Sequence, residues 1–252
     1  PLNRFTRIDY DKINRVTKVT DPQGKTQQWT YDGNSNRLTF RDAKNQVTTF
    51  TYDVMNRLKT KKDALLRTDT YSYDLSGNPI FFLDRRGLVT GFQYDALDRL
   101  TRTGFGATTT TAPVYTSTID YFYDAANRLT QAIDSANGTI TRTYDNRFDS
   151  VIKETTPQGT VDYAYYADGQ RQSMIPSSGS AVTYTYDAAQ RLTQLSQAAG
   201  LGGAMPATAQ AVGFTYDTAN RPTKVTLPNG ITMNYVYDAA SQLSFITYKK
   251  AD

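Results

Sequence analysis

The sequence contains no cysteine and no histidine. Without cysteine the chain has no disulfide bonds, no thiolate metal ligands and no cysteine nucleophile. Without histidine it lacks the usual general base near neutral pH and the commonest metal ligand in proteins, which excludes most hydrolase and metalloenzyme mechanisms. We therefore expect no enzyme activity, no catalytic, cofactor-binding or metal-binding residues, and no cofactor.

Long apolar stretches are also missing, and a run such as Ile80–Leu83 is far shorter than the roughly 18 apolar residues of a membrane helix. No membrane span is predicted. Apolar residues make up 38% of the chain, which is low for a deep aliphatic core, whereas 19 tyrosines provide large amphipathic surfaces. The net charge of +4 is spread over the whole chain and forms no cluster, so we expect no nucleic-acid partner.

What the sequence does contain is a repeat, best seen in Tyr52–Leu58 (YDVMNRL). Eight of the ten intervals between the repeated tyrosines are 21 residues long, and the other two are 29 and 30. Periods of about 20 to 50 residues are typical of solenoids, propellers and arrays. The repeat tyrosines are Tyr10, Tyr31, Tyr52, Tyr73, Tyr94, Tyr123, Tyr144, Tyr165, Tyr186, Tyr216 and Tyr237.

Each repeat is predicted to be a β-hairpin, because runs such as Val47–Tyr52 and Ala181–Tyr186 alternate with period two and are rich in Thr, Val and aromatic residues. One turn is the YDxxNR corner, where Asp accepts backbone amides and Asn tolerates a left-handed backbone. No helix is predicted. The second turns contain Pro, Gly or Asn and lie at Asp21–Gly24, Asp42–Asn45, Asp84–Gly87, Asp134–Gly138, Thr156–Gly159, Ser177–Gly179 and Leu227–Gly230.

The residue two positions before each tyrosine shares its face of the sheet and is aromatic in most repeats. We expect these side chains, and the aliphatic residue after each corner, to form ladders across strands spaced by about 4.8 Å. The aromatic pairs are Trp29/Tyr31, Phe50/Tyr52, Tyr71/Tyr73, Phe92/Tyr94, Tyr121/Tyr123, Tyr163/Tyr165, Tyr184/Tyr186, Phe214/Tyr216 and Tyr235/Tyr237, with Ile8 and Arg142 as exceptions. The aliphatic residues are Val16, Leu38, Leu58, Ile80, Leu100, Leu129, Leu192 and Leu243.

Residues 1–252 are interpreted as one array of about eleven repeats. Two Gly-, Ala- and Thr-rich insertions, near residues 104–115 and 197–211, are predicted to be loops at second turns, because the repeat resumes in phase after each. The repeat at Tyr144 is interpreted as having a shortened corner. Since Leu2–Phe5 resembles the end of a further repeat and the chain stops within a period, we expect a section of a longer array.

The charged corner residues are predicted to be structural. A charge-assisted bond within one turn would hold the corner in the pairs Asp32/Arg37, Asp53/Arg57 and Asp124/Arg128. Arg142, which interrupts the aromatic ladder, is expected to face solvent or a neighbouring loop.

Tyr-Asp followed by Asn-Arg-Leu and Asp-Pro-x-Gly, at this period, resembles the YD repeats of the RHS family. That family includes bacterial polymorphic toxins, shell-forming components of insecticidal toxin complexes, and the teneurins. The motif matches at Tyr31-Asp32 with Asn36-Arg37-Leu38, Tyr52-Asp53 with Asn56-Arg57-Leu58, Tyr123-Asp124 with Asn127-Arg128-Leu129, and Tyr216-Asp217 with Asn220-Arg221. It departs at Tyr166 in place of Asp, at Gln190 and Ser241 in place of Asn, and at Pro222 in place of Leu.

The resemblance implies an all-β array of antiparallel hairpins that forms a curved or spiralling sheet, part of a hollow shell. It implies a non-enzymatic, secreted or cell-surface module, exported from bacteria, that encloses, carries or presents a toxin or effector polypeptide. The expected partners are that polypeptide and further RHS repeats or a capping domain. The alternative is an adhesion or carbohydrate-binding array that uses its aromatic face. Such arrays favour tryptophan, whereas this chain has only Trp29.

Family toxins often carry a self-cleaving aspartyl site after the repeats. The DPQG sequence at Asp21–Gly24 occupies an ordinary turn of the repeat. No proteolytic role is therefore predicted for it.

Overall fold

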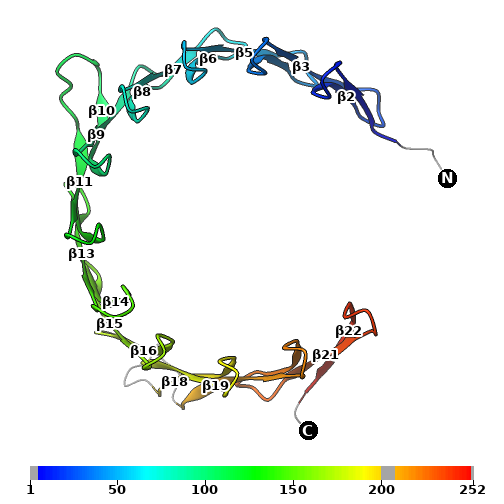
Figure 1. Ribbon diagram of the computed structural model, residues 1–252, viewed down its shortest axis with the longest axis vertical. Helices are drawn as coiled ribbons and strands as arrows, with labels where there is room; N and C mark the ends of the chain where they lie inside the picture. The colour runs from blue at the N-terminus through cyan, green and yellow to red at the C-terminus, as the bar shows by residue number, and fades with distance from the viewer. Residues whose placement is uncertain (1–4, 200–207, 251–252) are drawn as a thin grey trace. The chain divides into compact units, whose positions relative to one another are not determined.

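The computed structural model describes residues 5–199 and 208–250. These residues form 22 β-strands and no helix (Figure 1), and each strand that pairs with its neighbour in sequence does so antiparallel. The predicted all-β array of antiparallel hairpins is therefore confirmed. None of the described residues belongs to a helix long and apolar enough to cross a membrane.

By its contacts the chain divides into two compact units, residues 1–122 with 133–136 and residues 123–132 with 137–252. The first unit is a meander in which each strand bonds to the next. Its strands are β1 (Arg7–Tyr10), β2 (Val16–Thr20), β3 (Thr26–Tyr31), β4 (Arg37–Arg41), β5 (Val47–Tyr52), β6 (Leu58–Lys62), β7 (Thr68–Tyr73), β8 (Pro79–Leu83), β9 (Val89–Tyr94), β10 (Leu100–Ala107) and β11 (Ser117–Tyr123).

The second unit is a meander of the same kind. Strand β12 (Leu129–Asp134) contributes residues to both units. The strands that follow are β13 (Gly138–Tyr144), β14 (Val151–Thr156), β15 (Gly159–Tyr165), β16 (Arg171–Pro176), β17 (Val182–Tyr186), β18 (Leu192–Gln197), β19 (Gln210–Tyr216), β20 (Pro222–Thr226), β21 (Thr232–Tyr237) and β22 (Leu243–Lys249).

The two kinds of turn share one construction. At the corner after Tyr52, Asp53 Oδ1 accepts the backbone amides of Met55 and Arg57, each at 2.9 Å, and Asn56 has a left-handed backbone with φ 61°. At the second turn after β2, Asp21 accepts the corresponding amides, and Gly24 takes the left-handed position with φ 82°. Most regular turns therefore combine an Asp with a residue that tolerates positive φ, although Leu227 replaces the Asp in the turn after β20 and Leu66 takes the left-handed position in the turn after β6.

Each unit is a single layer of sheet in Figure 1, so the core is thin. Among the described residues, the buried apolar side chains are Phe50, Val89, Ala107 and Val225. Cross-strand contacts replace a deep interior: the rings of Trp29 and Phe40 lie 5.5 Å apart between centroids, and those of Tyr71 and Phe82 lie 5.1 Å apart.

The predicted aliphatic row is wrong at two positions. Opposite Tyr31 the register places Arg37, one residue before the predicted Leu38, and opposite Tyr73 it places Pro79, one residue before Ile80. The register shifts at the tyrosine in these hairpins, as it does between Thr51 and Tyr52, and the shift marks a β-bulge. The position after the corner is therefore set by the bulge and not by the nearest aliphatic residue.

The corner after Tyr144 is longer than the others, and the predicted shortening is wrong. Six residues, 145–150, connect β13 to β14, whereas five residues, 53–57, connect β5 to β6. The following second turn compensates, because only two residues separate Thr156 at the end of β14 from Gly159 at the start of β15. Tyr165 therefore keeps the regular spacing.

The first insertion begins as strand. Gly104–Ala107 continue β10, and residues 108–116 form the loop that projects between β10 and β11 in Figure 1. From this loop Tyr115 returns over Gly91 and Gly104, which are paired across β9 and β10, and a Cβ atom at either glycine would collide with its ring or hydroxyl. In the second insertion, residues 200–207 lie outside the described residues, between β18 and β19.

Candidate functional site

The repeated feature of the chain is a set of contacts at the corner edge, which begins with an ion pair inside each corner. Arg57 Nε lies 2.7 Å from Asp53 Oδ2, and both side chains are about one quarter exposed. The backbone amide and guanidinium of Arg57 hold the pKa of Asp53 below its usual value. The same 2.7 Å pair forms in Asp11/Arg15, Asp95/Arg99, Asp124/Arg128, Asp187/Arg191 and Asp217/Arg221.

The corner arginine also reaches into the next hairpin. Arg57 Nη1 donates to the backbone carbonyl of Asp74 at 3.1 Å, and its guanidinium lies 4.5 Å from the centroid of the Tyr73 ring. Cation–π contact and a charge-assisted hydrogen bond thus act from one side chain. Arg15, Arg128 and Arg191 make the equivalent contacts with the hairpins that follow them.

The repeat tyrosine completes the link in the opposite direction. The hydroxyl of Tyr73 donates to the backbone carbonyl of Leu58 at 3.0 Å. Neighbouring hairpins pair near the second turn, from Thr60 with Thr70 to Lys62 with Thr68, so the tyrosine bonds a carbonyl beyond this short ladder. The same bond joins Tyr31 to Val16, Tyr52 to Arg37, Tyr144 to Leu129, Tyr165 to Val151, Tyr216 to Leu192 and Tyr237 to Pro222.

We call this arrangement the corner staple: the Asp–Arg pair of one corner together with the ring, the hydroxyl and the aspartate carbonyl of the next hairpin. Sequence reasoning identified the Asp–Arg pairs Asp53/Arg57 and Asp124/Arg128 but missed their reach into the next repeat. The repeated tyrosine could have indicated this contact between repeats, because a half-buried tyrosine hydroxyl needs a hydrogen-bond partner. In regular repeats that partner lies 15 residues earlier, as Tyr73 and Leu58 show.

The predicted pair Asp32/Arg37 does not form. This corner carries one more residue between Asp and Arg, and Ser35 takes the left-handed position with φ 69°, so Asn36 occupies the place of the arginine. Asn36 Nδ2 donates to Asp32 Oδ2 at 2.9 Å. Arg37 lies instead with its guanidinium 4.4 Å from the centroid of the Phe50 ring.

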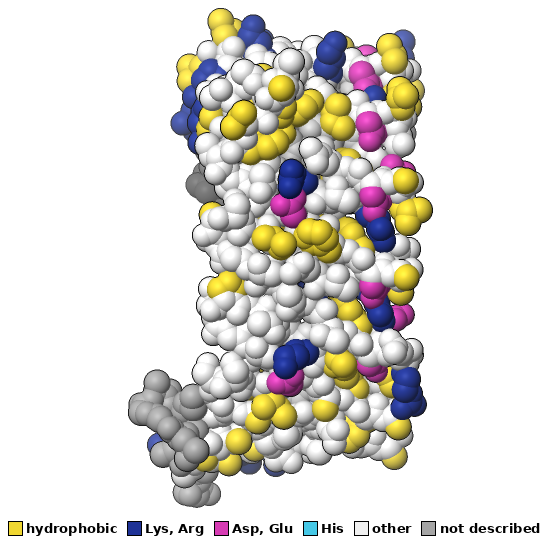
Figure 2. Space-filling view, turned by 90° about the vertical axis from the view of Figure 1, so that its left-hand side faces the viewer, with side chains coloured by type: hydrophobic (Ala, Val, Ile, Leu, Met, Phe, Trp, Pro, Cys, Tyr) yellow, Lys and Arg dark blue, Asp and Glu magenta, His cyan; other side chains and the backbone are white. Residues whose placement is uncertain are grey.

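The prediction that Arg142 faces solvent or a neighbouring loop is also wrong. Arg142 lies opposite Glu154 in the register of β13 and β14, and its Nε is 2.7 Å from Glu154 Oε2. A cross-strand ion pair thus replaces the aromatic contact of other hairpins. On the face drawn in Figure 2, acidic side chains likewise lie beside basic ones and do not form a separate patch.

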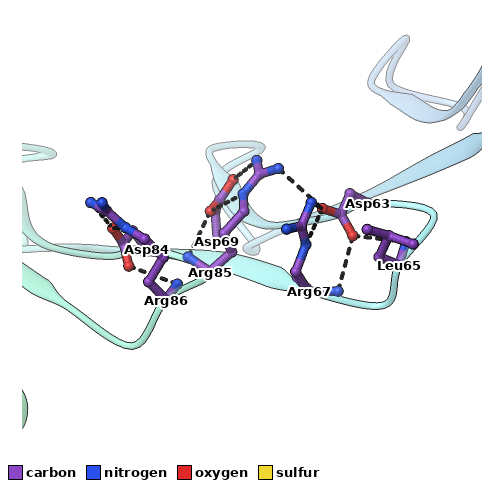
Figure 3. Close-up of polar contacts among 7 residues, drawn as sticks. All are labelled: Asp63, Leu65, Arg67, Asp69, Asp84, Arg85 and Arg86. Carbon is purple, nitrogen blue, oxygen red and sulfur yellow. Dashed lines mark hydrogen bonds and ion pairs between the residues drawn. The ribbon is translucent and has the colours of Figure 1, made fainter.

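Among the described residues, the most buried charged side chain lies at the other edge, between β7 and the turn after β8 (Figure 3). Asp69 is 5% exposed and accepts Arg85 Nη2 at 2.6 Å and the Arg85 backbone amide at 2.9 Å. The guanidinium hydrogen bond from Arg85 lowers the pKa of Asp69. Arg85 Nη1 also reaches Asp63 at 3.1 Å, and Arg67 lies 2.8 Å from the same Asp63 oxygen. This network links neighbouring second turns, and nothing in the sequence pattern marked it.

No group of three or more acidic side chains among the described residues is arranged to hold a metal ion. The chemistry of the corner staple and of the Asp69 network is instead hydrogen bonding and ion pairing between adjacent hairpins. Each charged group in them has its partner within the sheet. The site is therefore a set of structural joints.

A meander of hairpins joined through Tyr-Asp corners defines a YD-repeat sheet. The Teneurin YD-shell family model matches residues 4–147, more than half of the chain, and the RHS Repeat model matches residues 165–201. The chain belongs to the Teneurin YD-shell family, and its likeness to the RHS repeats is confirmed. Family membership supports a structural role as part of a shell.

Solved structures share the fold. The crystal structure of TcdB2-TccC3 matches with a TM-score of 0.59 and 14% identity over 99% of this chain and 17% of that chain. The same complex without its hypervariable C-terminal region matches with a TM-score of 0.59 and 13% identity, over 98% of this chain and 17% of that chain. The Photorhabdus luminescens Tc holotoxin pore matches with a TM-score of 0.53 and 14% identity, over 93% of this chain and 18% of that chain. The chain thus spans less than one fifth of the length of each of these three chains. No curated protein matches its sequence.

Proposed function

We propose that the chain is a section of a shell wall that encloses, carries or presents another polypeptide, a toxin or effector, without catalysing a reaction. The observation that carries this proposal is the corner staple. It joins hairpin to hairpin through side chains that the repeat itself supplies, so the sheet extends sideways without a second layer. This is what a thin wall requires, and membership of the shell family supports it.

The two edges of the sheet join neighbouring hairpins in different ways. Backbone pairing between hairpins lies near the second turns, as between β6 and β7. At the corners, a staple such as Arg57 to Tyr73 and Asp74 makes the connection. A wall built in this way keeps both faces free of a packed core, and so leaves one of them available to a cargo polypeptide.

Size supports a longer array as the complete shell. At about 4.8 Å per strand, the 22 strands span about 100 Å, and a closed ring of that circumference has a radius of about 16 Å. A folded toxin domain needs more room. We therefore infer that the wall continues through further YD repeats or a capping domain, which pair with its exposed end strands, and that the protein is exported to the outside or surface of a bacterial cell, as the family analogy indicates.

The carbohydrate-binding alternative requires open aromatic faces on which a sugar ring stacks. The guanidinium groups of Arg15 and Arg57 cover the rings of Tyr31 and Tyr73 at 4.6 and 4.5 Å from their centroids. Trp29 packs against Phe40 in the neighbouring strand. These contacts favour the wall.

The test is protease protection in the full-length protein that contains this chain. With the shell intact, we expect the enclosed toxin or effector segment of that protein, here called the cargo segment, to resist digestion. A variant with Arg57→Gln, Arg128→Gln and Arg191→Gln, which lacks three staples, should expose this segment to the protease. The matched control is Arg86→Gln, because Arg86 pairs with Asp84 inside one turn and is three quarters exposed. If the protease digests the cargo segment as fast in the wild-type full-length protein as it digests that segment on its own, the segment is not enclosed.

A further inference from the structure

Large apolar side chains stand exposed at the corner tips of the first unit, at the two positions after the corner aspartate. Val54 and Leu75 are fully exposed, and Ile13, Met55 and Leu97 are each about 60% exposed. They belong to four of the five corners in this unit, since the corner after Asp32 carries Gly33 and Asn34 instead. We call these five side chains the apolar tip row.

The repeat does not require these residues. Most corners use an aspartate and a residue with positive φ, whereas an apolar tip residue such as Met55 bonds through its backbone amide and not through its side chain. In the second unit the two positions after the corner aspartate, or after Tyr166 where it replaces the aspartate, carry small or polar residues: Ala125-Ala126, Asn146-Arg147, Ala167-Asp168, Ala188-Ala189, Thr218-Ala219 and Ala239-Ala240. The longer corner after Tyr144 also carries Phe148, which is 38% exposed. Exposed apolar groups in a regular row are typical of a contact surface.

We propose that the apolar tip row of the first unit binds the turn edge of a second YD-repeat array, and that a second copy of this chain is such a partner. The spacing selects this partner. Corners recur at every second strand, about 9.6 Å apart, whereas two turns of an α-helix rise about 10.8 Å. A helix would therefore be out of step by about 5 Å over the four intervals of the row, but another YD edge stays in step along its whole length.

Charge permits the approach of two such edges. The carboxylates of Asp11, Asp53 and Asp95 lie next to the tips, and each is paired at 2.7 Å with the arginine of its own corner. The fourth carboxylate beside the row, Asp74, accepts Asn78 Nδ2 at 3.2 Å in place of an arginine. Three of the four carboxylates are therefore neutralised within their own corners when two edges meet. The same patch on both partners gives an isologous contact, which closes as a dimer.

The area sets the strength of this contact for the isolated chain. Five tip side chains at roughly 100 Å² each offer about 500 Å², compared with about 800 Å² per partner in a standard interface. We expect reversible association of this chain in the high micromolar range, and tighter association when further repeats lengthen the edge. The proposal does not depend on whether the shell encloses a cargo.

The first test measures association by sedimentation equilibrium from micromolar to near-millimolar chain concentration. The double variant Val54→Ser with Leu75→Ser should weaken the dimer by about tenfold or more, because two fully exposed apolar groups leave the contact. The control, Ala125→Ser with Ala188→Ser, changes the equivalent corners of the second unit and should associate like the wild type. Pairing through the end strand β22 is the same in all three proteins. A monomeric wild type, or equal association of all three, would overturn the proposal.

The second test locates the contact and uses the absence of cysteine. Val54→Cys introduces a single thiol at the central corner of the apolar tip row, which faces its own copy in either alignment of an isologous contact, and Ala188→Cys introduces one at a control tip. Because neither side chain is buried, both variants should give the far-ultraviolet circular dichroism of the wild type. Mild oxidation should then convert Val54→Cys to a disulfide-linked dimer at least several-fold faster than Ala188→Cys. Equal rates would exclude the tip row as the interface.

Discussion

Removal of one tyrosine hydroxyl isolates the half of the corner staple that runs backward along the chain. Tyr31 is the best position, because its hydroxyl donates to the Val16 carbonyl at 2.8 Å and Trp29, the only tryptophan, lies two residues earlier on the same strand. Tyr31→Phe keeps the ring, and with it the contact with the Arg15 guanidinium at 4.6 Å from the ring centroid. The change therefore deletes one hydrogen bond and little else.

We expect Tyr31→Phe to lower the free energy of unfolding by about 1 kcal/mol. A net intramolecular hydrogen bond contributes about 0.5 to 1.5 kcal/mol, and the Val16 carbonyl is half-buried, so water replaces the phenol only in part. The transition is followed through the fluorescence of Trp29 during urea unfolding. We expect a lower midpoint and an unchanged slope, because the surface exposed on unfolding is the same.

Tyr248→Phe is the matched control, since Tyr248 is 68% exposed and its hydroxyl faces water. It should leave the midpoint unchanged. The same loss should recur, nearly additively, when Tyr31→Phe is combined with Tyr216→Phe in the other unit, because distant sites do not share partners. If Tyr31→Phe shifts the midpoint no more than Tyr248→Phe does, the hydroxyl does not hold the corner end of the hairpins together and the reasoning fails.

Three further predictions concern other parts of the sheet. Gly91→Ala should lower the thermal unfolding temperature by several degrees, because the new Cβ collides with Tyr115; adding Tyr115→Ala should then cost less than Tyr115→Ala alone. The pKa of Asp69 is lowered by the Arg85 guanidinium, so its contribution to stability is complete above its ordinary value of 3.8 and is lost as pH falls through the lower folded value. Asp69→Asn should therefore unfold more easily at neutral pH and show a flatter acid dependence in urea titrations. Leu66→Gly should lower the free energy of unfolding by less than about 1 kcal/mol or raise it, because Leu66 has φ 63° and glycine adopts that backbone without strain. The same change at the neighbouring exposed Leu65 should destabilise the turn.

The sequence alone predicted what depends on near neighbours in the chain. Alternation identified the strands, and the spacing within YDxxNR identified the Asp53/Arg57 pair, because both are local. The failure at Asp32/Arg37 has a local cause as well: the left-handed residue is the third after the Asp, which is Ser35 here and Asn56 in the corner after Tyr52, so Asn36-Arg37 comes one residue too late for Arg37 to pair with Asp32.

Contacts between residues farther apart in the chain were beyond the sequence for a different reason. The partner of Arg142 depends on the register of β13 and β14, which the long corner after Tyr144 shifts by a residue. The burial of Asp69 depends on Arg85, 16 residues later in the turn after β8. Tyr115 finds Gly91 only after its loop has folded back. In each case the pattern specifies the strand but not what lies beside it.

The division between the two edges makes the array tolerant of change at one edge and intolerant at the other. Both natural insertions enter between a second strand and the next hairpin, and the hydroxyl of Tyr216 still reaches Leu192 across the longer of them. A foreign peptide grafted into residues 108–116 would leave every corner untouched, whereas the same peptide placed after a repeat tyrosine would disrupt a corner and the corner staple that joins its hairpin to the next. The second-turn edge is thus the natural display surface of this protein, and whole hairpins are the unit by which its length can be engineered.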